Sequence, residues 1–227
     1  VFPHGYFYES AMVGGRGFVL EPLFQKAVAD KVLQPEDLRY FQNFSLPGKP
    51  GCMSFNCPHL AQLTDNTGAL ARAGAIVQGH AMICRLITFL QQYMPGFEHA
   101  YLLQEASMLG IRESWRLVGK YVLTEGDYTN KARFADGVAR GDWYIDVHSA
   151  TKGLFHQNTY RDGEYYEIPY RSMVCDEVEN MVVAGRCISA TFLMQASVRI
   201  IPTCIDMGQA AGEACTAALA AGVPLNA

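Results

Sequence analysis

The chain has 227 residues, of which 50% are hydrophobic and 18% are charged, and its formal net charge is -4. This length and apolar content suffice for one large domain or two small ones with a substantial core. The acidic balance, without any run of lysine or arginine, excludes the electrostatic surface that nucleic acids and anionic membranes require. We therefore expect a small-molecule partner and no nucleic acid. No uninterrupted apolar stretch approaches the length that spans a bilayer, so we also expect no membrane span.

The cysteines and the first residues indicate the setting in which the chain works. Its 7 cysteines are odd in number and lack the paired spacing of a disulfide framework or a zinc ribbon, which favours a reducing compartment and a cytoplasmic location. Cys52, Cys57 and His59 match no standard zinc spacing, so no metal is expected. Residues 1–10 have neither an initiating Met nor the pattern of a signal peptide, and we expect a fragment or a processed chain.

In chain order, a glycine-rich loop at 11–17 is followed by apolar spacing that predicts a short helix over 21–29. Four prolines between Pro35 and Pro58 predict a long surface excursion with little regular structure. Apolar residues then recur at helical spacing over 69–93, which predicts a long helix.

The second half of the chain is expected to consist of short strands and one last helix. Strands are predicted at 101–108, 143–147, 165–168, 181–184 and 196–201, while 119–123 fits either a strand or a helix end. Residues 124–127 have the pattern of a helix cap or turn. The alanine-rich run 204–221 predicts a buried helix directly after the last strand.

The most informative segment is 180–212. Ala184 and Gly185 end an apolar run, and the missing side chain of glycine lets a flat ligand approach the backbone. Pro202 and Thr203 then begin the last predicted helix, whose first amides have no intrahelical partner and attract negative charge. The pattern favours a ligand floor beside an anion-binding helix start.

Five stretches carry a resemblance in the same order along the chain. Asn-Met-Val-Val-Ala-Gly-Arg at 180–186 and Pro-Thr-Cys-Ile-Asp-Met-Gly-Gln-Ala-Ala-Gly at 202–212 resemble the C-terminal flavin-binding signature of the FAD-dependent oxidoreductase family, related in fold to fumarate reductase flavoproteins. The upstream stretches 110–124, 145–148 and 168–172 are similar to that family too. The resemblance covers the chain from about Pro22 onward.

The resemblance implies FAD as the cofactor and assigns residues to it. The implied cofactor-binding residues are Ala184, Gly185, Arg186, Thr203, Gly208, Gln209, Ala210, Ala211 and Gly212. Family members open with a Gly-x-Gly-x-x-Gly turn, but here Gly15 and Gly17 are followed by Leu20 where the third glycine belongs. We therefore expect a missing N-terminal FAD-binding segment or a partner chain. The chain also departs from the family at Phe192 and Leu193, where polar residues are usual, which puts substrate chemistry near Thr191 in doubt.

Candidate catalytic residues are His148, Arg171 and Arg186. His148 ends an expected strand and could donate a proton, with Asp146 orienting the loop; the alternative is a structural histidine. Five arginines, Arg112, Arg116, Arg171, Arg186 and Arg199, could converge on a carboxylate, or each could serve in an ordinary ion pair. Cys204 near the helix start is read as a packing residue rather than a reactive thiol.

Together these patterns predict a mixed α/β (α+β) chain: a C-terminal fragment of a Rossmann-like FAD-binding domain plus a substrate or cap region. We divide it into a substrate or cap region at 1–168 and a return into the FAD-binding domain at 169–227. The implied activity is hydride transfer between a small organic substrate and flavin, with the fragment inactive alone. The alternative is a non-enzymatic ligand-binding or structural module that keeps the scaffold and cannot hold FAD by itself.

Overall fold

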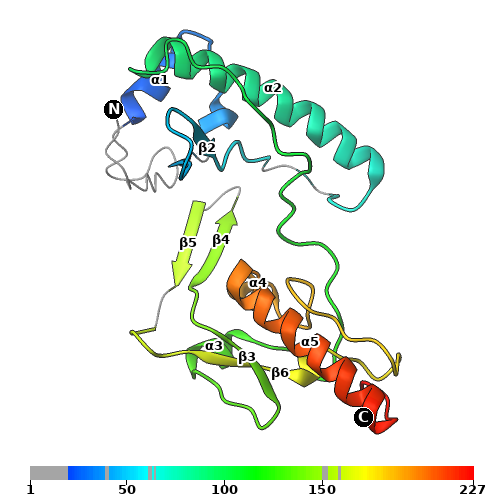
Figure 1. Ribbon diagram of the computed structural model, residues 1–227. Coiled ribbons are helices and arrows are strands. Elements are labelled where there is room, and N and C mark those ends of the chain that lie inside the picture. The colour runs from blue at the N-terminus through cyan, green and yellow to red at the C-terminus, as the bar shows by residue number, and fades with distance from the viewer. Residues whose placement is uncertain (1–19, 39–40, 61–62, 64, 150–152, 158–159) are drawn as a thin grey trace. The chain divides into compact units, whose positions relative to one another are not determined.

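The computed structural model describes residues 20–38, 41–60, 63, 65–149, 153–157 and 160–227, and at 148, 149 and 153–157 it describes the backbone only. The glycine-rich loop predicted at 11–17 lies outside these residues. The chain divides into a first unit, Val1–Gly110 with Ser149–Leu154, and a second unit, Ile111–His148 with Phe155–Ala227. The two units are drawn in Figure 1. The division predicted at Ile168 concerns the domains of a complete flavoenzyme and stays a prediction.

In the first unit, two helices pack on each other around aromatic side chains. Helix α1 (Glu21–Ala29) contacts α2 (Ala69–Tyr93), and the rings of Phe24 and Phe89 stack with centroids 4.5 Å apart. Between these helices in sequence lie the 3-10 helix η1 (Pro35–Leu38) and an antiparallel pair, β1 (Asn43–Ser45) and β2 (Met53–Phe55). Both predicted helices are confirmed with the expected bounds.

The predicted surface excursion at 35–58 is wrong in part. Phe41 and Asp37 are only 2% and 1% exposed, so this segment contributes to the core. Asp37 accepts two hydrogen bonds from Arg85 of α2, at 2.6 Å from Nε and 2.7 Å from Nη2. A buried carboxylate needs such a partner, and the pair fixes the segment against α2.

Helix α2 is long and apolar enough, by length and composition alone, to cross a membrane. This differs from the expectation that no stretch approaches that length. Only 28% of its most apolar window is buried within the chain, with a mean hydropathy of 1.4. Core helices of soluble proteins pass the same test, so one such helix is weak evidence for a span.

The second unit is built from short strands and two consecutive helices. Strands β3 (Gly137–Gly141) and β6 (Tyr166–Pro169) pair antiparallel, and β4 (Ile145–Ser149) pairs with β5 (Gly153–Gln157). The short α3 (Glu125–Thr129) precedes β3, the single 3-10 turn η2 (Tyr170–Ser172) follows β6, and α4 (Phe192–Val198) leads into α5 (Ile201–Ala221). Helix α5 packs on β3 (Figure 1).

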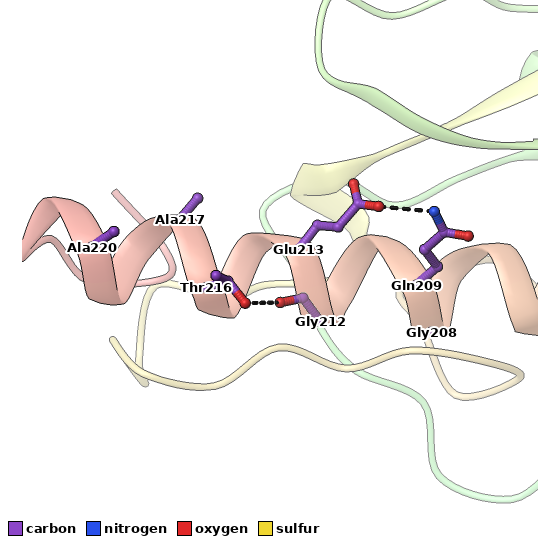
Figure 2. Close-up of a pocket in the computed structure, with 7 residues that line it drawn as sticks. All are labelled: Gly208, Gln209, Gly212, Glu213, Thr216, Ala217 and Ala220. Atoms are coloured by element: carbon purple, nitrogen blue, oxygen red, sulfur yellow. Dashed lines mark hydrogen bonds between the residues drawn. The ribbon is translucent and has the colours of Figure 1, made fainter.

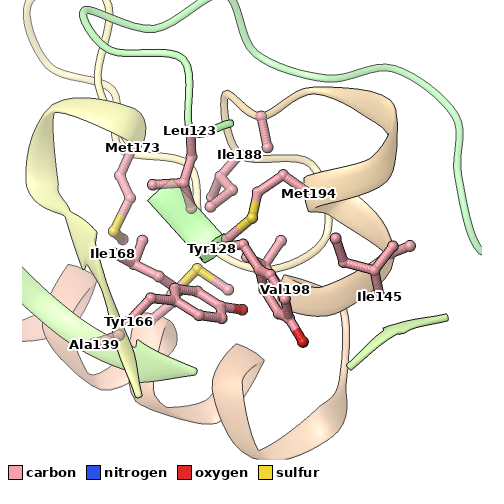
Figure 3. Close-up of a cluster of buried hydrophobic side chains, with 13 residues drawn as sticks. Leu123, Tyr128, Ala139, Ile145, Tyr166, Ile168, Met173, Ile188, Met194 and Val198 are labelled. Atoms are coloured by element: carbon pink, nitrogen blue, oxygen red, sulfur yellow. The ribbon is translucent and has the colours of Figure 1, made fainter. Parts of the chain in front are cut away.

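One apolar cluster holds the second unit together. It joins Tyr128 of α3, Ile168 of β6, Met194 of α4 and Met207 of α5, all fully buried (Figure 3). Tyr166 is also buried, and its hydroxyl lies 2.8 Å from Ser197 Oγ of α4. The cluster therefore ties the segments after Thr124 to the last two helices.

Three predicted strands, at 101–108, 181–184 and 196–201, are absent from the described structure. Residues 101–108 and 181–184 have no regular structure, and 119–123 contributes one bridge, Leu123 with Ala190. The predicted strand 196–201 is wrong, because these residues end α4 and begin α5. Thr191 caps α4, with its hydroxyl accepting from the Met194 amide at 3.3 Å, and this cap decides for a helix where the apolar run fits either structure.

Candidate functional site

The start of α5 adjoins the loop that contains Gly185. Gly185 has φ of +90°, a conformation that favours glycine, and a Cβ there would lie 3.9 Å from Cys204 Sγ. The Cys204 amide already donates to Ile200 O at 3.0 Å, which leaves the amides before it without intrahelical partners. The structure thus brings together predicted residues that lie about 20 positions apart, the 184–186 loop and the helix start at Thr203.

Helix α5 presents the other predicted cofactor residues on different faces. Thr203, Met207 and Ala211 turn toward the core, whereas Gly208 and Gly212 are exposed with nothing within 4 Å of an added Cβ. From Thr203 to Gly212 the helix rises by about 13 Å. The predicted set therefore divides into a group at the helix start and a group on the open face.

The open face of α5 is a shallow depression between small side chains (Figure 2). Its only long side chains are Gln209 and Glu213, which bond to each other at 2.8 Å. Its lining residues are Gly208, Gln209, Gly212, Glu213, Thr216, Ala217 and Ala220. An α-helix with so little side chain on one face can be approached closely by another backbone or by a ligand.

Gln195 connects the Gly185 loop to the segment after Gly110. It is only 3% exposed, and its Nε2 donates to Arg112 O at 2.7 Å and to Arg186 O at 3.5 Å. These bonds hold the backbones that carry Arg112 and Arg186 beside each other. The sequence carried a signal for Gln195, a polar side chain inside the apolar run 194–198, but no role was predicted for it.

Gln195 bonds to the backbones of three predicted arginines, Arg112, Arg186 and Arg199, whose side chains have few acidic partners. Arg186 Nη1 donates to the neutral Ser114 Oγ at 3.3 Å, and Arg199 Nη2 lies 3.1 Å from Asp146 Oδ2. Arg112 Nη1 is buried without any hydrogen-bond partner in the described part of the chain. Burial, followed by the positive charge of Arg112, lowers the pKa of Arg199.

Arg116 and Arg171 have their own acidic partners. Arg116 Nη2 lies 3.3 Å from Glu113 Oε1. Arg171 binds both oxygens of Asp136, with Nε at 2.9 Å and Nη2 at 3.2 Å, and lies over the ring of Tyr121. Of the five predicted arginines, the structure therefore leaves Arg112 and Arg186 without a carboxylate partner among the described residues.

The remaining predicted residues have mixed outcomes. The backbone of His148 lies in β4, but its side chain is outside the described part of the structure. Cys204 packs against the core of the second unit, and burial raises the pKa of its thiol, which agrees with a packing role. Among the described residues, no group of His, Cys, Asp and Glu is arranged to hold a metal ion.

The Gly185 loop thus adjoins a helix start whose first amides have no intrahelical partner, an arrangement that can accept negative charge on a ligand. A sequence profile described as FAD dependent oxidoreductase matches residues 18–227. The chain belongs to the FAD-dependent oxidoreductase family. The match covers all but the first 17 residues, so both units are part of this flavoprotein family. No curated protein and no solved structure matches the chain.

Proposed function

We propose that this chain forms the substrate-binding and flavin-edge part of an enzyme that transfers a hydride between a small organic anion and FAD. The observation that carries the proposal is the buried Nη1 of Arg112, which has no hydrogen-bond partner among the described residues and lies on a backbone that Gln195 joins to that of Arg186. These residues adjoin the Gly185 loop and the start of α5, where the flavin edge fits. Substrate and cofactor would then meet in the second unit.

The charges of the arginine group favour an anionic substrate. Among the described residues, only two carboxylates, Glu113 and Asp146, pair with the four arginines Arg112, Arg116, Arg186 and Arg199. Leaving a charged donor buried without a partner costs about 1–3 kcal/mol or more. A substrate carboxylate supplies the missing acceptor, and its two oxygens match the paired donors of a guanidinium group.

Gly185, Arg186 and the first amides of α5 are the residues that would hold the flavin edge. When bound, FAD supplies the hydride acceptor or donor of the reaction. The partial positive charge of the helix start stabilises negative charge placed there. Arg112 and Arg199 bind and orient the substrate, Gln195 holds the backbones of Arg112 and Arg186, and His148 is proposed to deliver a proton.

Arg171 receives a different role in this proposal. Its guanidinium is engaged by Asp136, and its backbone amide donates to Asp136 Oδ2 at 3.1 Å. We assign it to holding the loop before β3 against the 3-10 turn that follows β6. Its replacement is expected to affect folding more than substrate binding.

We further propose that a dinucleotide-binding segment packs on the open face of α5. Three large apolar side chains on this helix, Ile201, Ile205 and Leu219, are 76%, 63% and 86% exposed. This is more exposed apolar surface than a surface helix usually has. Together with Gly208 and Gly212 they form a stripe with spacings of four, three, four and seven residues, which suits a packed helix.

We also propose a reducing, cytoplasmic location for the chain, which its seven unpaired cysteines favour.

The test uses the polypeptide that combines this chain with its dinucleotide-binding segment and is loaded with FAD. Small carboxylates and their matched amides are mixed with the oxidised and the reduced protein, and the flavin absorbance is followed. Only the carboxylates are expected to change the flavin spectrum. Equal responses to a carboxylate and its amide, or no response to any compound, would refute the proposed substrate class.

Arg112→Gln is the most informative variant, because it removes a charge that has no carboxylate partner among the described residues. Loss of a charge-assisted bond worth about 1.5–3 kcal/mol is expected to raise KM for the carboxylate by roughly tenfold to a hundredfold. The free energy of unfolding should stay constant or rise. Arg140→Gln, an exposed arginine stacked on Tyr165, serves as the control and should leave KM unchanged.

A further inference from the structure

A second chemical group lies in the first unit, in residues that the proposed flavin site does not use. His80 and Cys84 are four positions apart on α2 and therefore share one face of the helix. His80 Nδ1 lies 2.7 Å from Glu105 Oε1, and His80 Nε2 lies 3.7 Å from Cys84 Sγ. The imidazole thus stands between a thiol and a carboxylate, with one ring nitrogen toward each.

The order thiol, imidazole, carboxylate is that of an activated nucleophile. Glu105 is a carboxylate and accepts a hydrogen bond from Nδ1–H of His80. Nε2 is then the unprotonated nitrogen, and it faces the thiol as an acceptor. Nε2 can then take the proton of Cys84, and the carboxylate stabilises the imidazolium that forms. A thiolate is the reactive form of cysteine in substitution reactions.

Two ordinary explanations fit this group less well. The group is not arranged to hold a metal, since no metal-binding set is found among the described residues and each ring nitrogen already has its own neighbour. A packing role requires burial, but Cys84 is exposed and the His80 side chain is 60% exposed. The thiol is therefore open to molecules in solution.

The position of Cys84 within α2 decides which electrophile suits it. In the middle of a 25-residue helix the neighbouring amides are bonded within the helix, so they offer no oxyanion hole for acyl transfer. Attack on a disulfide moves negative charge onto a sulfur atom and needs no such donors. An exposed site also admits a disulfide without an enclosing pocket.

We propose that Cys84 is a nucleophilic thiol that exchanges with low-molecular-weight disulfides, with His80 as its base and Glu105 positioning His80. The Cys84 proton passes to His80 Nε2, and the thiolate attacks one sulfur of the disulfide. A bond forms between Cys84 Sγ and that sulfur, the disulfide bond breaks, and the leaving thiolate takes the proton from His80. The products are a mixed disulfide at Cys84 and one free thiol.

Cys215 offers a matched internal comparison. It is exposed and lies within a helix, α5, as Cys84 lies within α2, but no described histidine is within hydrogen-bonding distance of its sulfur. The native full chain is incubated with glutathione disulfide at neutral pH, and peptide mass spectrometry follows the mixed disulfide at both cysteines. Cys84 is expected to react at least about tenfold faster than Cys215.

Variants separate the base from the surrounding surface. His80→Gln should reduce the rate at Cys84 to that at Cys215, and Glu105→Gln should give an intermediate rate with the helix content unchanged. Gln78→Ala, an exposed position on the same helix, is the control and should leave the rate unchanged. Equal rates at Cys84 and Cys215, or an unchanged Cys84 rate in His80→Gln, would overturn the proposal, and neither result bears on the flavin site.

Discussion

The side-chain amide of Gln195 donates a hydrogen bond of 2.7 Å to the backbone carbonyl of Arg112, which lies 83 positions earlier in the chain. The same nitrogen reaches Arg186 O at 3.5 Å. One buried amide therefore joins the backbones of the two arginines that have no carboxylate partner among the described residues. The geometry of the proposed anion site depends on this contact.

Gln195→Leu tests that dependence through stability. The substitution keeps the side-chain size but leaves the Arg112 carbonyl without its donor, so we expect the free energy of unfolding to fall by about 1–3 kcal/mol. Urea unfolding measures the change. Gln209→Ala is the matched control, because Gln209 is exposed and its side chain bonds, among the described residues, to Glu213 alone. This variant should change stability by less than about 0.5 kcal/mol. Equal effects of the two variants would contradict this account of Gln195.

Gly208→Leu separates the stability of the chain from its assembly. Replacing an exposed glycine inside α5 by a good helix former should raise the free energy of unfolding by about 0.5–1 kcal/mol. The same side chain would obstruct the segment proposed to pack on this face, so flavin retention in the combined polypeptide should fall. Gly74→Leu in α2 is the control, since its Cβ also meets nothing within 4 Å, and it should not affect flavin retention. Unchanged retention in Gly208→Leu would argue against docking on α5.

Asp136 should contribute an acid-dependent part of the stability. Partial burial acts to raise the pKa of Asp136, but hydrogen bonds from Arg171 outweigh it and hold the pKa below its ordinary value. A carboxyl with a lowered pKa in the folded state stabilises the fold above its unfolded pKa, and this contribution is lost as the pH falls through the folded pKa. Asp136→Asn should therefore unfold more easily than the parent near neutral pH, with the difference vanishing in strong acid. Urea unfolding across that pH range checks this, with the exposed Asp162→Asn as control.

Cys57 should be alkylated more slowly than Cys84, the exposed thiol of the same unit. Burial raises the pKa of its thiol to about 11, so at pH 8 only about 0.1% is thiolate. Alkylation with iodoacetamide at pH 8 should label Cys57 much more slowly than Cys84, and the difference should disappear in concentrated urea. Fast labelling of Cys57 in the folded chain would contradict this raised pKa.

The sequence predicted the features that depend on residues close together in the chain, and it missed those that depend on residues far apart. Periodic apolar residues predicted α1 and α2 with their bounds, and Thr124 was expected at a cap that the structure forms with Asp127. The run 196–201 was mistaken for a strand, because short apolar runs fit either structure and the deciding cap at Thr191 lies outside the run. The partners of Asp37 and Gln195 lie 48 and 83 positions away, and no local pattern predicts such contacts.

The candidate site was predictable only in part for the same reason. The motif around Gly185 and Thr203 directed attention to two segments that the structure does bring together. Which arginines lack an acidic partner could not be read from residue types, since Arg171 and Arg112 look alike in sequence while only Arg171 has a carboxylate opposite it. That distinction depends on Asp136, which lies 35 positions from Arg171.

The most direct measurement is the flavin absorbance spectrum of the combined polypeptide carrying Gly185→Ala, recorded after loading with FAD and removing the excess. Gly163→Ala is its matched control, because Gly163 and Gly185 have φ of +81° and +90°, and alanine at either position should cost about 1 kcal/mol of stability. The account predicts that Gly163→Ala keeps the parent spectrum, whereas Gly185→Ala loses flavin or shifts its bands. An unchanged spectrum in Gly185→Ala would contradict the placement of the flavin edge at this loop and the start of α5.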